Sequence, residues 1–239
     1  MNELKRKKLQ YFYDYYKGHV IVGVVVLCIV ISVVVGKLNE KEVLLTGILL
    51  NSQMTLEDTV AGLKAQFLEE VQRDPEEAEL TLLTKWRYDA DAKEYSEDNY
   101  YALQTLSAQT AGEVLDFMIG DLDTMTVLAY GDYFEDISLI LTEAQMKRCE
   151  SNLLYMDMAV LEAAKAAVDA EAYDTQIIIP DCTKPEEMEK PVPVFIDLSH
   201  CRQLEEFYPD AADKAVLAVT VNAPHAEMLV KWVEFLLEK

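Results

Sequence analysis

The sequence predicts a membrane-anchored α/β domain with a mainly parallel sheet. Three observations support this. A basic segment comes first, and an uncharged apolar run follows it at residues 20–36. After that run, short β-prone stretches alternate with stretches of helical periodicity. Such alternation of strands and helices is typical of β-α-β units. We divide the chain into a cytoplasmic basic and aromatic segment (1–19), a transmembrane helix (20–36), a linker (37–42) and an extracellular domain (43–239).

The run at 20–36 sits at the short end of what spans about 30 Å of hydrocarbon. Five basic residues precede it: Lys5, Arg6, Lys7, Lys8 and Lys17. The positive-inside rule therefore places the N-terminus in the cytoplasm and residues 43–239 outside the cell. Tyrosines and a phenylalanine at 11–16 are typical of an aromatic belt at the headgroup layer.

Three alternatives to a permanent anchor fit the sequence less well. A cleaved signal predicts an A-x-A-like site after a shorter apolar core, and none follows. A lipoprotein signal needs a small residue before its cysteine, but Leu27 precedes Cys28. A buried helix of a soluble protein leaves the adjacent charges and aromatics unexplained. We expect a single-pass signal anchor in the cell membrane.

The first half of the domain reads as strand and helix in turn. VLLTGILLN (43–51) suits a strand buried on both faces. Thr55 and Asp58 resemble a capping box, and apolar residues then recur at helical spacing up to Val71. DPEE (74–77) ends this helix, and ELTLLTK (79–85) is a second strand. A polar loop (86–98), a helix (98–111), a strand (113–121) and a helix (124–130) follow.

The second half is less regular. Thr142 is expected to cap a short helix, LLYMD (153–157) is a candidate strand, and 159–172 is alanine-rich and helical by propensity. TQIIIP (175–180) and PVPVFID (191–197) are strand candidates on either side of a charged turn. We expect a helix at 200–207, a buried strand at 215–222, and a final helix that begins near Pro224.

Composition excludes several functions. The chain holds 43 acidic and 21 basic residues, a net charge of −22, so nucleic acid is not an expected partner. It lacks H-E-x-x-H, G-x-S-x-G and Walker motifs, and no spacing of His200, Cys201 and His225 fits a standard zinc site. We expect neither an enzyme nor a cofactor or metal. Cys182 and Cys201 are the best candidates for a disulfide among the three cysteines beyond the anchor.

Three stretches resemble extracellular solute-binding proteins of the type 2 periplasmic-binding class. They are AGEVLDFMIGDLDTMTVLAYGDYFEDIS (111–138), PVFIDLSHCRQLEEFY (193–208) and LAVTVNAPHAEMLVKWVEFLLE (217–238). DYYKGHVIVGV (14–24) is similar to single-pass membrane proteins of Gram-positive bacteria. The resemblance implies a two-lobed α/β fold with a ligand between the lobes. The domain is small for that family, and a transmembrane anchor replaces the usual lipid anchor.

Candidate ligand-binding residues follow the strands, because ligands of open α/β sheets settle beyond the carboxyl ends of strands. They are Asn51, Ser52, Trp86, Tyr88, Asp121, Asp123, Asn222 and His225. Trp86 and Tyr88 suit stacking on a ligand, and Asp121 and Asp123 suit a cation or hydroxyls. Ser52, Asp121, Asp123 and Asn222 also suit helix caps, which need no ligand.

Two functions from different classes remain open. The first is non-enzymatic capture or sensing of a small ligand by a membrane-tethered domain. The second is a structural or interaction protein of the cell envelope that keeps the fold without a small ligand. A hydrolase with an unrecognised site is a third, weaker alternative, since fold does not settle function.

Overall fold

The computed structural model describes residues 41–53, 57–90, 92, 96–170, 178–209 and 215–238. Its fold lies in one compact unit, Val43–Lys239. The predicted transmembrane span (20–36) lies outside the described residues. Among the residues that are described, no helix has both the length and the apolar character needed to cross a membrane.

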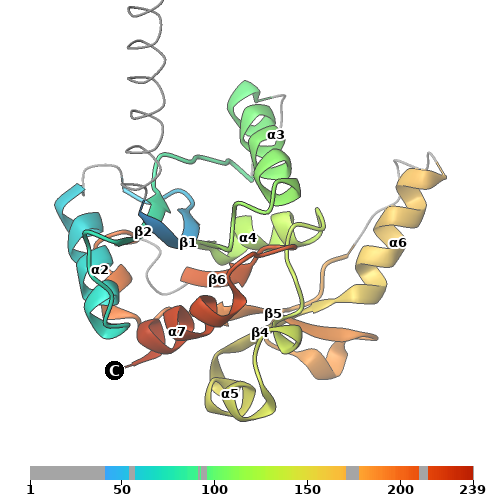
Figure 1. Cartoon of the computed structure of the whole chain (residues 1–239). Coiled ribbons are helices and arrows are strands. Elements are labelled where there is room, and N and C mark those ends of the chain that lie inside the picture. Colours follow the sequence, from blue (N-terminus) through green and yellow to red (C-terminus); the bar gives the residue numbers. More distant parts are fainter. Residues whose placement is uncertain are drawn as a thin grey trace, which may run out of the picture. The chain divides into compact units, whose positions relative to one another are not determined.

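Six strands form one sheet in the order β2-β1-β3-β6-β5-β4 (Figure 1). Their bounds are β1 Glu42–Leu49, β2 Ala78–Leu83, β3 Phe117–Asp121, β4 Leu153–Asp157, β5 Pro191–Asp197 and β6 Ala215–Val219. β1 and β3 are parallel, whereas β6 is antiparallel to both β3 and β5, and β4 is antiparallel to β5. The sheet is therefore mixed, and only part of the expected parallel arrangement is present.

A single sheet replaces the two lobes that the resemblance implied. β6 lies between β3 and β5 and pairs with both, for example through Ile119 and Leu217 on one side and Leu217 and Ile196 on the other. This shared strand joins the two halves of the domain by continuous backbone hydrogen bonds. The two-lobed expectation is therefore wrong for the described residues.

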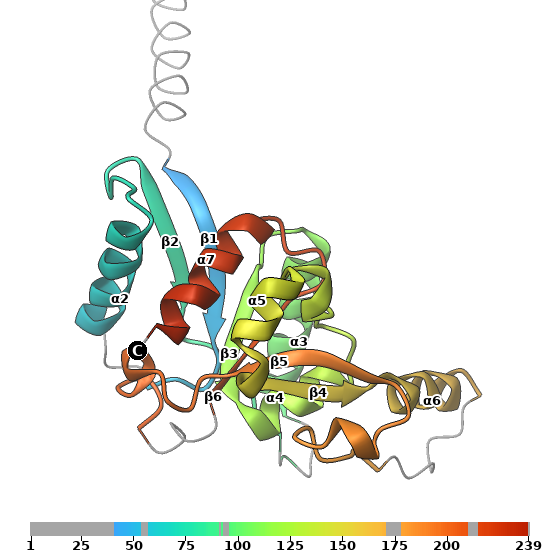
Figure 2. The same cartoon turned by 90° about the horizontal axis from the view of Figure 1, so that it is seen from below.

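Helices cover both faces of the sheet (Figures 1 and 2). Their bounds are α2 Glu57–Glu70, α3 Glu97–Ala111, α4 Leu122–Ala129, α5 Glu143–Arg148, α6 Met158–Asp169 and α7 Ala226–Leu237. One core joins the β1, β3 and β6 side chains to α2 and α7, and the other joins them to α3, α4 and α6. Alternate strand residues supply the two cores, as the period-2 pleat requires.

Trp232 of α7 lies at the centre of the first core and is fully buried. The ring of Phe67 meets it edge-on with centroids 4.9 Å apart, and Phe117 and Phe235 lie at 5.4 Å and 5.5 Å. Phe117 also covers Gly47 of β1, where an added Cβ would stand 2.1 Å from its ring. The glycine lets the aromatic cluster pack directly on the sheet.

Most predicted elements agree with the structure, and two details differ. Thr142 caps α5 in a capping box with Gln145, as expected. Residues 178–180, the described part of the strand candidate at 175–180, are not a strand, and Arg202–Leu204 is a single 3₁₀ turn rather than a helix. Thr55 of the expected cap on α2 lies outside the described residues.

Candidate functional site

The carboxyl ends of β1, β2 and β3 meet at one edge of the sheet. The N–H of Asn51 donates to the carbonyl of Trp86 (3.0 Å), and that of Leu50 donates to Ile119 (2.8 Å). The helix after β1 packs on one face of the sheet, and the helix after β3 packs on the other. Such a reversal between neighbouring parallel strands is the switch point at which open α/β sheets bind ligands.

Asn51 closes this edge with its own side chain. Its Oδ1 accepts from the N–H of Tyr88 (2.9 Å), and its Nδ2 donates to the Tyr88 carbonyl (2.9 Å) and to the Asp121 carboxylate (3.4 Å). Asn51 has a φ of 57°, a left-handed conformation that asparagine tolerates better than most residues. The side chain therefore serves the chain's own backbone.

Arg87 holds the loops after β1 and β2 together. Its guanidinium donates to the carbonyls of Thr84 (3.1 Å) and Trp86 (2.7 Å) and to that of Ser52. Ser52 is buried, and its hydroxyl donates to the Thr84 carbonyl (3.2 Å). Arg87 was not predicted as a site residue, because no spacing pattern marks an arginine whose partners are backbone carbonyls.

Tyr208 covers the switch point itself. It is 3% exposed, and its hydroxyl donates to the carbonyl of Ile119 in β3 (2.8 Å). The neighbouring Phe207 is fully buried and accepts at its carbonyl from the N–H of Gln53 (3.1 Å). Burial raises the pKa of Tyr208 well above 10, so its phenol stays a neutral donor. The segment after β5 thus fills the crevice between β1 and β3.

Asp121 and Asp123 play different parts at the end of β3. Asp121 is the N-cap of α4, and its Oδ1 accepts from the N–H of Thr124 (2.9 Å). Asp123 lies exposed in the first turn of that helix. Asp121 is therefore a helix cap, one of the two roles that the sequence allowed. Among the described side chains, no third ligand joins the two carboxylates to form a cation site.

Asn222 and His225 lie at the opposite edge of the sheet from the other candidates. They follow β6, and β6 runs antiparallel to β3, so its carboxyl end pairs with the start of β3: Val219 opposes Phe117. Asn222 is an exposed turn residue with a φ of 61°. The eight predicted residues therefore lie at two different edges of the sheet, because β6 is antiparallel to β3.

His225 instead contacts Asp116, a fully buried aspartate just before β3. The Asp116 carboxylate accepts from the N–H of Thr46 (2.7 Å) and of His225 (2.9 Å), and His225 Nδ1 lies 3.1 Å from it. This arrangement ties β1, β3 and the start of α7 together. A charged residue inside the apolar stretch EVLDFMIGD was the signal that such a partner exists.

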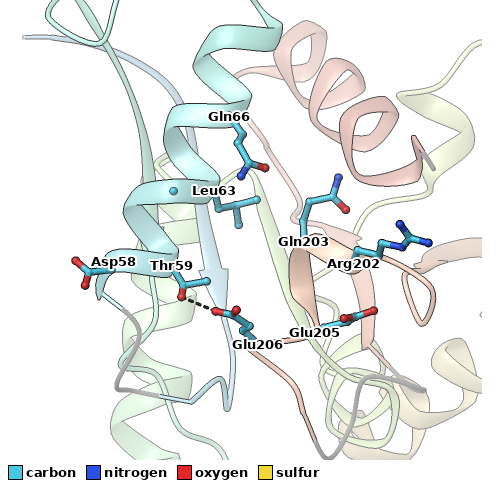
Figure 3. A pocket seen from close by; sticks show the side chains of 9 residues that line it. Asp58, Thr59, Leu63, Gln66, Arg202, Gln203, Glu205 and Glu206 are labelled. Carbon is cyan, nitrogen blue, oxygen red and sulfur yellow. Dashed lines mark hydrogen bonds between the residues drawn. The ribbon is translucent and has the colours of Figure 1, made fainter.

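A groove of about 440 Å³ lies beside the same carboxyl edge, between α2 and the segment after β5 (Figure 3). Asp58, Thr59, Leu63 and Gln66 line it from α2, and Arg202, Gln203, Glu205 and Glu206 line it from the other side. Thr59 Oγ1 donates to the Glu206 carboxylate (2.7 Å) across the groove. Its lining is largely polar, and only Leu63 offers a large apolar side chain.

Three cysteines in the described part of the chain are free thiols, including the expected pair Cys182 and Cys201. Burial raises the pKa of Cys149 and of Cys182, and raises that of Cys201 to about 11. Protonated thiols are poor nucleophiles. These three cysteines therefore suit a role in packing better than a role as reactive nucleophiles.

Neither a metal-ligand cluster nor a related protein assigns a role to this edge of the sheet. Within the described ranges, no group of three or more His, Cys, Asp or Glu side chains is placed to hold a metal ion. Comparison with protein-family models, curated proteins and solved structures found no match to this chain. The site is therefore interpreted from its own geometry.

Proposed function

We propose that this chain is a single-pass membrane protein whose extracellular domain, residues 43–239, binds another protein of the cell envelope. The switch-point crevice carries the proposal. Asn51, Tyr88 and Asp121 bond to one another there, and Tyr208 covers the ends of β1 and β3. Among the residues that the structure describes, a crevice filled by the chain's own hydrogen bonds leaves no free group at that point to recognise a small solute.

We also propose that the domain is related to type 2 periplasmic-binding proteins. The half from β1 to β3, with helices on both faces and a switch point between β1 and β3, is consistent with one lobe of such a protein. In this view the domain keeps the scaffold and uses its surface for a partner. The anchor at 20–36 holds that surface near the membrane.

A ligand panel tests the proposal. Residues 37–239 are purified, and their thermal unfolding is followed with amino acids, peptides, polyamines and divalent ions. A ligand at 100 times its Kd adds about 2.7 kcal/mol, which raises Tm by about 5–10 °C in a domain of this size. An interaction domain shows no such shift, and the full-length protein extracted from membranes elutes with a stoichiometric partner.

Capture of a small polar solute is the second candidate, and the groove between α2 and Arg202–Glu206 favours it. A clear shift with one chemical class would replace the first proposal with this one. Gly62→Leu then identifies the site, because Gly62 lines the groove and an added Cβ there meets no atom within 4 Å. The variant should abolish the shift while the domain stays folded.

Topology is tested separately. We expect that protease added to intact cells degrades residues 43–239 and leaves an N-terminal fragment of the anchor with its basic segment. Protection of the domain until the cells are lysed would overturn the extracellular assignment without changing the fold. An epitope tag at each end of the chain distinguishes the two results on one blot.

A further inference from the structure

A second groove, of about 400 Å³, lies between the segment that leaves β2 and helix α3. We call it the aromatic groove. Residues 85–87 line one side, and Asp98, Tyr101, Ala102 and Thr105 of α3 line the other. The crevice plugged by Tyr208 and the groove beside α2 contain none of the α3 residues. It is therefore a distinct surface.

Two aromatic rings flank this groove. Trp86 is half-buried and packs partly against the core, while Tyr101 is 55% exposed. The small side chains of Ala102 and Thr105 leave the space between them hollow. Tyr88, which the sequence paired with Trp86 for stacking, does not line this groove. An exposed ring on a helix flank, in the same groove as a tryptophan, offers flat apolar surface to a ligand.

Polar groups around the rings lack partners within the described part of the chain. Lys85 Nζ, Trp86 Nε1, the Asp98 carboxylate and Tyr101 Oη make no hydrogen bond or ion pair there. Arg87 bonds to backbone carbonyls through its two terminal nitrogens, which fixes its position beside the groove. The groove thus offers both donors and acceptors, held on two separate segments.

This mixture selects the kind of ligand. Lys85 and Arg87 disfavour a cation, and Asp98 together with the net charge of −22 disfavours an anion. A neutral ligand with many hydroxyls meets both donors and acceptors. A pyranose ring also has a flat face of C–H groups that packs on an aromatic ring, and 400 Å³ is within the range of ligand pockets.

We propose that the aromatic groove binds a neutral glycan, with a sugar ring packed on Trp86 and Tyr101 and its hydroxyls bonded to Lys85 and Asp98. The groove is open at the surface, so a chain of sugars fits it better than a single enclosed ring. The inference does not depend on the protein-binding function, because the crevice that carries that function involves other side chains.

Tryptophan fluorescence offers a direct readout. The chain has two tryptophans, and Trp232 is fully buried, so a ligand in the groove changes the emission and acrylamide quenching of Trp86. The full chain in phosphatidylcholine vesicles is titrated with cellotetraose, chitotetraose and maltotetraose. Triglycine, spermidine and citrate serve as zwitterionic, cationic and anionic comparisons. We expect saturable protection of Trp86 by at least one tetrasaccharide and none by the three comparisons.

Two neighbouring tyrosines provide a matched pair of variants. Tyr101→Ala removes one wall and should weaken binding about tenfold, as expected for loss of an aromatic contact worth up to about 1.5 kcal/mol. Tyr100→Ala removes a ring that is similarly exposed (51%) on the same helix but does not line the groove, and should change Kd less than about twofold.

Three results would overturn the inference: no tetrasaccharide protects Trp86, a charged comparison ligand protects it equally well, or the two tyrosine variants weaken binding equally. None of these bears on whether the domain has a protein partner. Both tyrosines are surface residues, so both variants should fold, and an unchanged far-UV circular dichroism spectrum confirms it.

Discussion

At the residue scale, buried carboxylates hold loops to the sheet. Asp157 at the end of β4 is 6% exposed and accepts from the backbone N–H groups of Ala159 (3.0 Å), Glu189 (2.9 Å) and Lys190 (3.0 Å). Burial raises the pKa of Asp157, but these three bonds outweigh it and lower the pKa below the ordinary 3.8. The ionised form therefore stabilises the folded state.

Asp157→Asn should reduce the free energy of unfolding by about 1–3 kcal/mol at pH 7. A group whose pKa is lowered on folding contributes its full stability above the unfolded value, and that contribution falls as pH drops below 3.8 toward the folded pKa. The gap between wild type and variant should therefore narrow in that window. Urea unfolding at pH 7 and at pH 3 measures it.

Asp132→Asn is the matched control for this measurement. Asp132 pairs with Lys165 (2.6 Å) at the surface, where such a pair contributes less than about 1 kcal/mol. Its φ of 66° is one that asparagine adopts readily. An equal loss in the free energy of unfolding in both variants would show that the three backbone hydrogen bonds to Asp157 stabilise the fold no more than a surface ion pair does.

Thiol reactivity tests the burial of the cysteines. The pKa of about 11 leaves roughly one Cys201 in a thousand as thiolate at pH 8, so iodoacetamide should not label it in the native domain. Unfolding without reductant should expose every thiol of residues 37–239 to labelling, and mass spectrometry counts them. A pair that labels only after reduction would show a disulfide between Cys182 and Cys201.

At the scale of the element, substitution of glycine by alanine should have opposite effects on stability at two positions. Gly47→Ala places a Cβ against the Phe117 ring in the tightest part of the core, and should destabilise by about 1–3 kcal/mol. Gly62→Ala lies within α2 with no atom within 4 Å of the new Cβ, and should stabilise by about 0.5–1 kcal/mol. Thermal unfolding of both variants measures these changes in stability. Two changes in Tm of the same sign would contradict the packing described around Gly47 and Gly62.

The sequence predicted elements better than their directions. Apolar runs and helical spacing identified β1, α2, β3 and α7 to within a few residues, because burial on the sheet imposes those periods. The direction of β6 was not predictable in this way. Its residues read the same in a parallel or an antiparallel pair when both faces are buried, so the edge at which Asn222 and His225 lie could not be predicted.

At the scale of the whole molecule, the candidate site was predicted in part. Asn51, Ser52, Trp86, Tyr88 and Asp121 do gather after β1, β2 and β3, because parallel strands align their carboxyl ends. Their bonds to one another, and the cover formed by Tyr208, depend on contacts between segments far apart in the chain. No local pattern reports such contacts.

Charge acts on the whole domain as well. Residues 37–239 carry 16 basic and 41 acidic side chains, a net of −25, while the lysine and arginine ion pairs described in them lie at the surface. Repulsion among so many like charges destabilises the compact folded state. Surface ion pairs offset only a small part of this repulsion. Salt should therefore stabilise the domain rather than weaken it.

Raising NaCl from 10 to 150 mM shortens the screening length from about 30 to about 8 Å. We expect the free energy of unfolding in urea to rise by an amount on the order of 1 kcal/mol at pH 7, because repulsion between distant carboxylates is screened first. The same titration near pH 4.4, the isoelectric point calculated for the 239-residue chain, is the control, since net repulsion is much smaller there. A salt effect of equal size at both pH values would mean that it does not arise from net charge. A loss of stability at pH 7 would mean that the surface ion pairs, such as Lys190 with Glu162, outweigh the repulsion.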